Sequence, residues 1–270
     1  MTLDLVLDIG NSRVKGGIFE GKKLIEFFAF NSQPLNQDEF VCFFKGKSIK
    51  NVFVSSVNTK AEVGIKNYFE QQKIGYTFLN HSHLNLILDV DEPEALGHDR
   101  IANAYGALAR FPLNDCIVVD IGTTITVDFI VKEGRYLGGM IYSGAGLCAK
   151  ALADYTDKLP LVALKKPDSA LAKTTETHLQ AGIYYGQLGA IERMVDELRL
   201  LAISPSSVKV IATGGATQID DTNVCFDKVA LIEDLKDFVD FIDPHLTLVG
   251  LREILDEMLI KKNENTKKKE

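Results

Sequence analysis

One short pattern occurs twice in this chain and constrains its fold more than any other feature. The first copy ends an apolar run with Asp8-Ile9-Gly10-Asn11-Ser12, and 112 positions later the second ends one with Asp120-Ile121-Gly122-Thr123-Thr124. Both copies place a carboxylate and a glycine where a buried strand ends. The repeat therefore predicts two lobes of similar construction, and 270 residues are enough for both because a domain typically has roughly 100 to 200.

Each copy of the pattern is followed by two more runs that alternate in polarity as β-strands do. These runs span residues 14–19 and 23–30 in the first half and residues 126–132 and 136–142 in the second. Gly21-Lys22 and Glu133-Gly134 supply turn residues between them. Each half is therefore predicted to open as a three-stranded meander.

Shorter apolar runs and helical periodicities follow the meanders. Strands are expected at 51–57 and 208–212, and helices at 61–72, 99–110 and 175–201. We predict an α/β protein with two similar lobes, mixed β-sheets and a ligand cleft between the lobes. The predicted parts are an N-terminal lobe (1–112), a C-terminal lobe (113–260) and a flexible charged tail (261–270).

Charge and cysteine usage exclude several classes of partner. The chain has 30 Lys and Arg against 37 Asp and Glu, a net charge of −7, so a nucleic-acid partner is not expected. No apolar run approaches the roughly 18 residues of a membrane span. The four cysteines form no C-x-x-C pair and are interpreted as reduced, buried residues of a cytoplasmic protein.

Three glycine-rich segments are candidates for binding a phosphate. Gly16 to Lys23 resembles a P-loop, but Lys23 replaces the hydroxyl residue that binds magnesium, and the segment lies between two strands. Gly144 to Ala149 matches the G-x-G-x-x-[GA] dinucleotide pattern, although it ends a meander instead of opening a βαβ unit. The third candidate is the repeated strand-end pattern itself.

The repeated pattern has the groups that nucleotide binding requires. A carboxylate at the end of a buried strand can hold magnesium, and the adjacent glycine lets backbone N–H groups approach phosphate oxygens. Asn11, Ser12, Thr123 and Thr124 add short hydrogen-bond donors. Each copy alone is equally compatible with a plain strand and turn. Two copies at matching places favour the binding site.

Four segments in series resemble type III pantothenate kinase along essentially the whole chain. They are residues 8–15 (DIGNSRVK), 97–100 (GHDR), 120–128 (DIGTTITVD) and 138–144 (GGMIYSG). The resemblance implies the duplicated actin-like, ribonuclease-H-like ATPase fold. It also implies ATP-dependent phosphorylation of pantothenate to 4′-phosphopantothenate, the first step of coenzyme A biosynthesis, by a cytoplasmic homodimer. The implied cofactors are Mg²⁺ and a monovalent cation, K⁺ or NH₄⁺.

The resemblance also implies roles for individual residues. The ATP-binding residues would be Asp8, Ile9, Gly10, Asn11, Ser12, Arg13, Val14, Lys15 and Thr123. The pantothenate-binding residues would be Gly97, His98, Asp99, Arg100 and Thr175, with Asp99 as the catalytic base. Asp120 would bind the monovalent cation, and Asp8 would bind magnesium.

Three positions depart from the family pattern. Ser143 replaces a proline and Ser12 replaces a threonine, which are mild changes. Val90 stands where the family has a substrate-lining tyrosine, so one pantothenate contact is in question.

Other interpretations of the same residues stay open at this stage. Asp99 is also compatible with an ordinary helix N-cap, and His81 with His83 forms an H-x-H pair that lacks a third metal ligand. The alternative functions are a non-catalytic nucleotide-binding regulatory relative of the same fold and a nicotinamide-linked oxidoreductase that uses Gly144-Ala145-Gly146. The long helix over 183–201 has more apolar surface than one lobe needs, which favours a homodimer.

Overall fold

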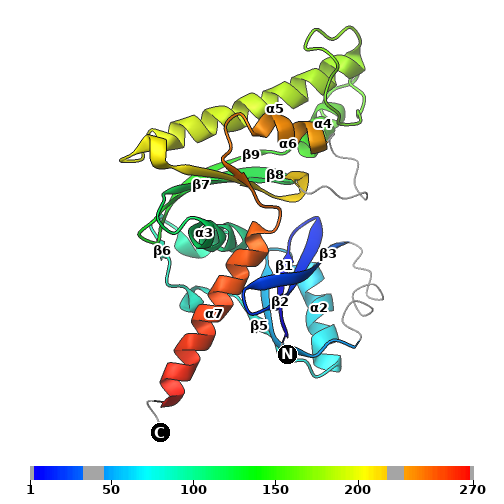
Figure 1. Ribbon diagram of the computed structural model, residues 1–270. Coiled ribbons are helices and arrows are strands. Elements are labelled where there is room, and N and C mark those ends of the chain that lie inside the picture. The colour runs from blue at the N-terminus through cyan, green and yellow to red at the C-terminus, as the bar shows by residue number, and fades with distance from the viewer. Residues whose placement is uncertain (1–2, 33–45, 218–227, 268–270) are drawn as a thin grey trace. The chain divides into compact units, whose positions relative to one another are not determined.

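The chain forms two compact units in the computed structural model, which describes residues 3–32, 46–217 and 228–267 (Figure 1). Unit 1 combines Met1–Arg110 with Leu246–Glu270, and unit 2 is Phe111–His245. This division differs from the one predicted from sequence, where 113–260 formed a single lobe. The difference arises because the C-terminal helix packs onto elements of the first unit.

The sheet of unit 1 has the strand order β3-β2-β1-β4-β5. Strands β1, β2 and β3 form the predicted antiparallel meander, while β4 lies parallel to β1 and β5 lies parallel to β4. The strand bounds are β1 Leu3–Ile9, β2 Arg13–Glu20, β3 Lys23–Asn31, β4 Ile49–Ser56 and β5 Thr77–Phe78. A further short strand, β6, spans Ile87–Leu88.

The sheet of unit 2 repeats this topology. Five of its six strands run in the order β9-β8-β7-β10-β11, with an antiparallel meander from β7 to β9 and with β10 and β11 parallel to β7. The strand bounds are β7 Cys116–Ile121, β8 Thr124–Val131, β9 Arg135–Ser143, β10 Lys209–Thr213 and β11 Phe241–Ile242. The duplication and the mixed sheets predicted from the sequence are therefore confirmed.

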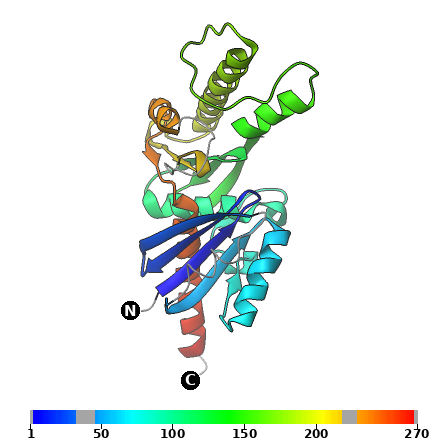
Figure 2. The same cartoon turned by 90° about the vertical axis from the view of Figure 1, so that its right-hand side faces the viewer.

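Helices cover both faces of the first sheet (Figures 1 and 2). Helix α2 (Thr59–Gln71) packs Ile65 and Phe69 against Leu7 and Ile9 of β1, while α7 (Leu246–Lys267) lies on the opposite face beside α3 (His98–Arg110). Burial of these apolar side chains stabilises the unit by removing them from water.

Helix α7 is bound to unit 1 by polar contacts as well as by its apolar side. The buried Arg252 guanidinium pairs with Asp4 of β1 at 3.1 Å, and Thr247 donates a hydrogen bond to Asn103 of α3 at 2.7 Å. The backbones of α3 and α7 approach closely at Gly250. The helix continues to Lys267, so most of the predicted flexible tail is helical, consistent with the helix propensity of lysine and glutamate.

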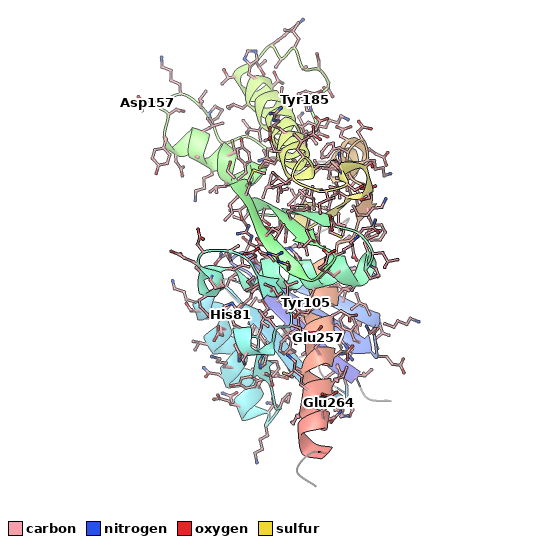
Figure 3. All side chains as sticks on the ribbon, turned by 90° about the vertical axis from the view of Figure 1, so that its left-hand side faces the viewer. His81, Tyr105, Asp157, Tyr185, Glu257 and Glu264 are labelled. Atoms are coloured by element: carbon pink, nitrogen blue, oxygen red, sulfur yellow. The ribbon has the colours of Figure 1, made fainter. Side chains whose placement is uncertain are left out.

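A tyrosine on α3 links the same helix pair to the segment before β6. Tyr105 accepts hydrogen bonds from the backbone N–H groups of Asn85 (2.7 Å) and Leu86 (3.0 Å), and it donates one to Glu257 of α7 (3.2 Å; Figure 3). Burial raises the pKa of the Tyr105 hydroxyl to about 12 and also raises the pKa of Glu257. This cluster connects three segments that are far apart in sequence.

The longest helix of unit 2, α5 (Thr175–Arg199), covers one face of its sheet (Figure 1). Its apolar side chains Ile191, Val195 and Leu198 pack into the core with Val119 and Val127. The other helices are α4 (Ala145–Asp154) and α6 (Lys228–Leu235), with 3₁₀ turns η3 (Pro205–Ser207) and η4 (Gly215–Thr217). Among the residues that the structure describes, no helix is both long and apolar enough to cross a membrane.

The cysteines are only partly as predicted. Cys116 is buried and its thiol donates to the Asn114 carbonyl at 3.5 Å, but Cys148 is half-buried because it lies on a helix surface. Burial raises the pKa of the Cys116 thiol to about 12. Cys42 and Cys225 lie outside the described residues.

Candidate active site

The first strand-end loop is a tight connection between β1 and β2. The Gly10 N–H donates to the Arg13 carbonyl at 2.9 Å, which closes a turn over Gly10, Asn11 and Ser12. Asp8 is buried at the end of β1 and accepts a hydrogen bond from Ser55 at 3.4 Å. Lys15 lies directly opposite Asp8 in the β1–β2 ladder, so both side chains lie on one face of the sheet.

Two polar side chains that the sequence analysis did not select support this loop. Asn58 caps α2 by accepting from the N–H groups of Lys60 (3.1 Å) and Ala61 (3.2 Å), and its amide donates to the Gly10 carbonyl at 3.3 Å. Ser32, at the end of β3, donates to the same carbonyl at 2.7 Å. An asparagine between a strand and a helix is the signal that would have identified the first of them.

The predicted substrate segment forms the start of α3. The Gly97 carbonyl accepts the first helical hydrogen bond, from Ile101, so Asp99 lies inside the first turn and is not the N-cap. The Asp99 carboxylate accepts from the Arg100 N–H at 2.8 Å. A methyl group at position 97 would lie 2.5 Å from the Asp99 oxygen, so glycine leaves room for this carboxylate.

The first loop and the substrate segment both contact the end of β4. Ser55 bonds to Asp8, and the backbone of the next residue, Ser56, bonds to the His98 ring. Burial lowers the pKa of His98 below its ordinary value of 6.5, and the neighbouring His81 lowers it further. Unit 1 thus brings the Asp8 loop and the turn of Asp99 to the same edge of its sheet.

The second strand-end loop, in unit 2, is one residue shorter than the first. The Gly122 N–H donates to the Thr124 carbonyl at 3.0 Å. Gly144, the N-cap of α4, donates to the Thr123 carbonyl at 3.0 Å, and a methyl group there would lie 2.2 Å from the Gly122 oxygen. Gly144 therefore supports the Thr123 loop. Because the segment that begins at Gly144 follows an antiparallel strand, the structure does not support its interpretation as a dinucleotide-binding motif.

Asp120 lies among hydroxyl groups at the end of β7. Thr126 of β8 and Thr213 of β10 are its direct neighbours across the two ladders, and within the described part of the chain both hydroxyls are buried without a hydrogen-bond partner. A methyl group at Gly214 would lie 2.4 Å from the Asp120 oxygen. A carboxylate beside unpartnered hydroxyl oxygens is a donor set that fits a hard cation.

The remaining predicted residues are spread over both units. Thr175 is exposed in the first turn of α5, where its neighbour Thr174 is the N-cap. The Ser143 carbonyl accepts from Gln187 of α5 at 3.0 Å, a buried contact that the sequence analysis missed. Val90 is half-buried between β6 and the 3₁₀ turn η2 (Pro93–Ala95).

The structure does not support two of the alternative interpretations, the P-loop and the histidine metal pair. The P-loop-like segment over 16–23 is strand β2, a turn and the start of β3, so it leads into a strand where a P-loop would lead into a helix. Of the histidine pair, His81 bonds to Glu94, whereas His83 accepts from the Asn80 N–H at 3.3 Å and its ring is tilted by 56° against that of Phe53. The two side chains thus serve different local contacts.

Two sheets that share one five-strand arrangement, each with a carboxylate and a glycine loop where its first strand ends, define the class of this protein. It is an α/β protein with the duplicated actin-like, ribonuclease-H-like ATPase fold. A sequence model of the type III pantothenate kinases matches residues 4–197. The chain belongs to the type III pantothenate kinase family, and it is a kinase.

Individual relatives support this assignment. A type III pantothenate kinase of Francisella tularensis is 35% identical over 242 residues, which cover 85% of this chain and 93% of the relative. One from Legionella pneumophila is 31% identical over 259 residues, covering 92% and 96%. A Baf-family protein from Campylobacter jejuni is similar in structure, with a TM-score of 0.56, 24% identity and coverage of 97% and 99%. This last likeness shows the fold alone.

Proposed function

We propose that this kinase transfers the γ-phosphoryl group of ATP to the primary hydroxyl of pantothenate and forms 4′-phosphopantothenate, the first step of coenzyme A biosynthesis. The observation that carries the proposal is the Gly97–Arg100 turn. It places a carboxylate and a guanidinium in the first turn of α3, and His98 of the same turn reaches the sheet edge where Asp8 ends β1. Pantothenate has a hydroxyl to be deprotonated and a carboxylate to be bound.

The strand-end loops are the proposed ATP site. Backbone N–H groups over Gly10 to Arg13, together with Lys15, would bind phosphate oxygens, and Thr123 would contact ATP from the second loop. Asp8 fits a magnesium site because a single carboxylate plus phosphate oxygens is a common arrangement for this ion. The ion would neutralise phosphate charge during transfer.

The turn over Gly97 to Arg100 is the proposed pantothenate site. The hydroxyl oxygen attacks the γ-phosphorus, the bond from that phosphorus to ADP breaks, and Asp99 accepts the hydroxyl proton. The planar Arg100 guanidinium is suited to bind the pantothenate carboxylate. Thr175 would supply a further polar contact, whereas Val90 cannot donate the hydrogen bond that a tyrosine would.

The direct test is to incubate the purified protein with ATP, Mg²⁺ and pantothenate and to measure phosphopantothenate by mass. The product is expected only when all three are present. A non-catalytic regulatory relative would bind ATP and yield no product. An oxidoreductase would bind NAD in preference to ATP, so a parallel binding measurement with the two nucleotides separates this alternative.

Catalysis is expected to depend on K⁺ or NH₄⁺, with Asp120, Thr126 and Thr213 as the cation-binding groups. Because these hydroxyls have no other partner in the described chain, a cation of suitable size would satisfy them. Replacing all K⁺ with Na⁺ is expected to lower the rate by roughly 10-fold or more. An Asp120→Asn variant should lose this difference between the salts. Equal wild-type rates in both salts would remove Asp120 from the role.

We also propose a cytoplasmic homodimer in which unit 2 supplies the interface. Large apolar side chains are exposed on β9, α4 and α5, at Ile141 (65% exposed), Tyr142, Leu147 and Tyr185. Such surface is uncommon on a monomer. Light scattering at micromolar concentration is expected to give twice the chain mass of 29.8 kDa. A Tyr185→Glu variant should shift the protein toward the monomer, and a monomeric wild type would contradict the proposal.

A further inference from the structure

Three side chains form a row at the proposed pantothenate turn. One of them, His98, belongs to the turn, and the other two, His81 and Glu94, have no role in the chemistry described above. His81 of the 3₁₀ turn η1 (His81–His83) bonds through Nδ1 to the Glu94 carboxylate of η2. The His81 and His98 rings meet edge to face, with centres 6.0 Å apart and planes at 71°. His98 in turn bonds to the backbone of Ser56. The row therefore runs from η2 to the end of β4.

The row of Glu94, His81 and His98 contacts the chain on both sides of Asp99 in the Gly97–Arg100 turn. Glu94 lies three residues before Gly97, and His98 lies directly before Asp99. His81 contacts both of them, although it comes from a segment 13 residues before Glu94. The first position of the turn is a glycine, which has no side chain to fix it. The orientation of the turn relative to the Asp8 loop thus depends on contacts made from outside the turn.

We propose that His81 is a positioning residue for the pantothenate turn: it braces Glu94 on one side and His98 on the other, and so orients Asp99 and Arg100 toward the substrate. This inference rests on the proposed function, in which that turn binds pantothenate. His81 does not touch the reacting atoms, and it acts through the backbone on either side of Asp99.

The charges around His98 favour its neutral form, and we expect His81 to hold the turn best when His98 is neutral. The charged and titratable groups that face His98 are His81 of η1, Glu94 of η2 and Glu62 of α2. Burial lowers the pKa of His98, and His81 lowers it further, so His98 is neutral at pH 7. As the pH falls through that lowered pKa, His98 gains a proton and a positive charge beside His81. Acidification is therefore expected to loosen the turn.

The test compares His81→Ala with His83→Ala, a matched control in the same 3₁₀ turn. His83 caps that turn through the Asn80 N–H and does not contact His98 among the interactions described. His81→Ala is expected to lower kcat/KM for pantothenate at least about 10-fold, because small misplacements of catalytic groups are costly, while KM for ATP stays within about twofold. His83→Ala is expected to keep the wild-type kcat/KM.

Glu94→Ala is the second variant, since its side chain is 82% exposed and its loss should not impair folding. It is expected to lower kcat/KM for pantothenate in the same direction by about threefold. Wild-type values in both His81→Ala and Glu94→Ala would overturn the proposal. An equal loss in His81→Ala and His83→Ala would also overturn it, because the effect would then belong to the stability of η1.

A measurement that needs no activity separates this inference from the proposed function. The NMR titration of the His98 ring should have its midpoint below 6.5 in the wild type and move upward in His81→Ala but not in His83→Ala. Failure of the wild type to phosphorylate pantothenate would contradict the proposed function. The titration would still test the contact between His81 and His98. An unchanged midpoint of the His98 titration in His81→Ala would overturn the inference that His81 positions His98.

Discussion

Replacement of Asp99 by asparagine is expected to lower kcat for pantothenate phosphorylation by about 100-fold or more, as loss of a general base commonly does. Asparagine has the same size and can still accept the hydrogen bond that the Arg100 N–H donates at 2.8 Å. What it lacks is the negative charge that takes the hydroxyl proton during transfer. KM for ATP is expected to change little, because the ATP-binding residues lie elsewhere. Steady-state kinetics with both substrates measure the two effects.

A neighbouring carboxylate provides the control for this prediction. Asp91 is exposed in the segment that precedes η2, so Asp91→Asn removes the same charge without altering the start of α3. We expect it to keep wild-type kinetics. The role of Asp99 as the base is falsified if Asp99→Asn retains a near-normal kcat in a folded protein, and the carboxylate would then serve only the N-terminus of α3.

The substitution Gly250→Ala is expected to destabilise unit 1 by about 3 kcal/mol, at the upper end of the cost of overpacking. A methyl group at this position would lie 1.7 Å from the Ala102 carbonyl oxygen, and the obstructing atom belongs to the backbone of α3. Alanine favours a helix over glycine by about 1 kcal/mol, but this gain is smaller than the cost of separating α7 from α3. Urea denaturation followed by circular dichroism measures the difference.

Gly75→Ala is the matched control in the same unit. Nothing lies within 4 Å of a methyl group at Gly75, which is exposed after α2. This variant is expected to be neutral or slightly more stable, because alanine reduces the freedom of the unfolded chain. Equal stability of Gly250→Ala and Gly75→Ala would show that the α3–α7 contact is looser than the structure indicates.

The loop residues of the site were recognisable from the sequence, whereas the side chains that support them were not. Asp8, Gly10 and Gly122 stand in a repeated local pattern that any reader of the sequence can detect. Asn58 supports the first loop at Gly10, 48 positions away, and Gln187 contacts Ser143, 44 positions away, beside Gly144. Contacts at such separations leave no local periodicity. The sequence pattern of a polar residue in a helix is the same whether its side chain is solvated or hydrogen-bonded to a loop.

The roles of two glycines also depend on tertiary contacts that the sequence does not reveal. Gly144 suggested a nucleotide motif because its spacing matched one, but the structure shows that position 144 requires glycine to fit against the Thr123 loop. The sequence analysis assigned no packing role to Gly250. The reason for each lies in a neighbour that is distant along the chain, and only packing brings that neighbour close.

The sequence by itself determined the two meanders, strands β4 and β10, helices α2, α3 and α5, and the duplication, because these follow from the alternation of apolar residues, from turn glycines and from a repeated motif. Only the tertiary structure decided that α7 belongs to unit 1 and that His81 contacts His98. It also decided that Asp120 lies beside two hydroxyls that have no hydrogen-bond partner in the described part of the chain. Local periodicity records which face of an element is buried. It does not record which other element covers that face, since that choice depends on the shapes and hydrogen-bonding groups of both surfaces.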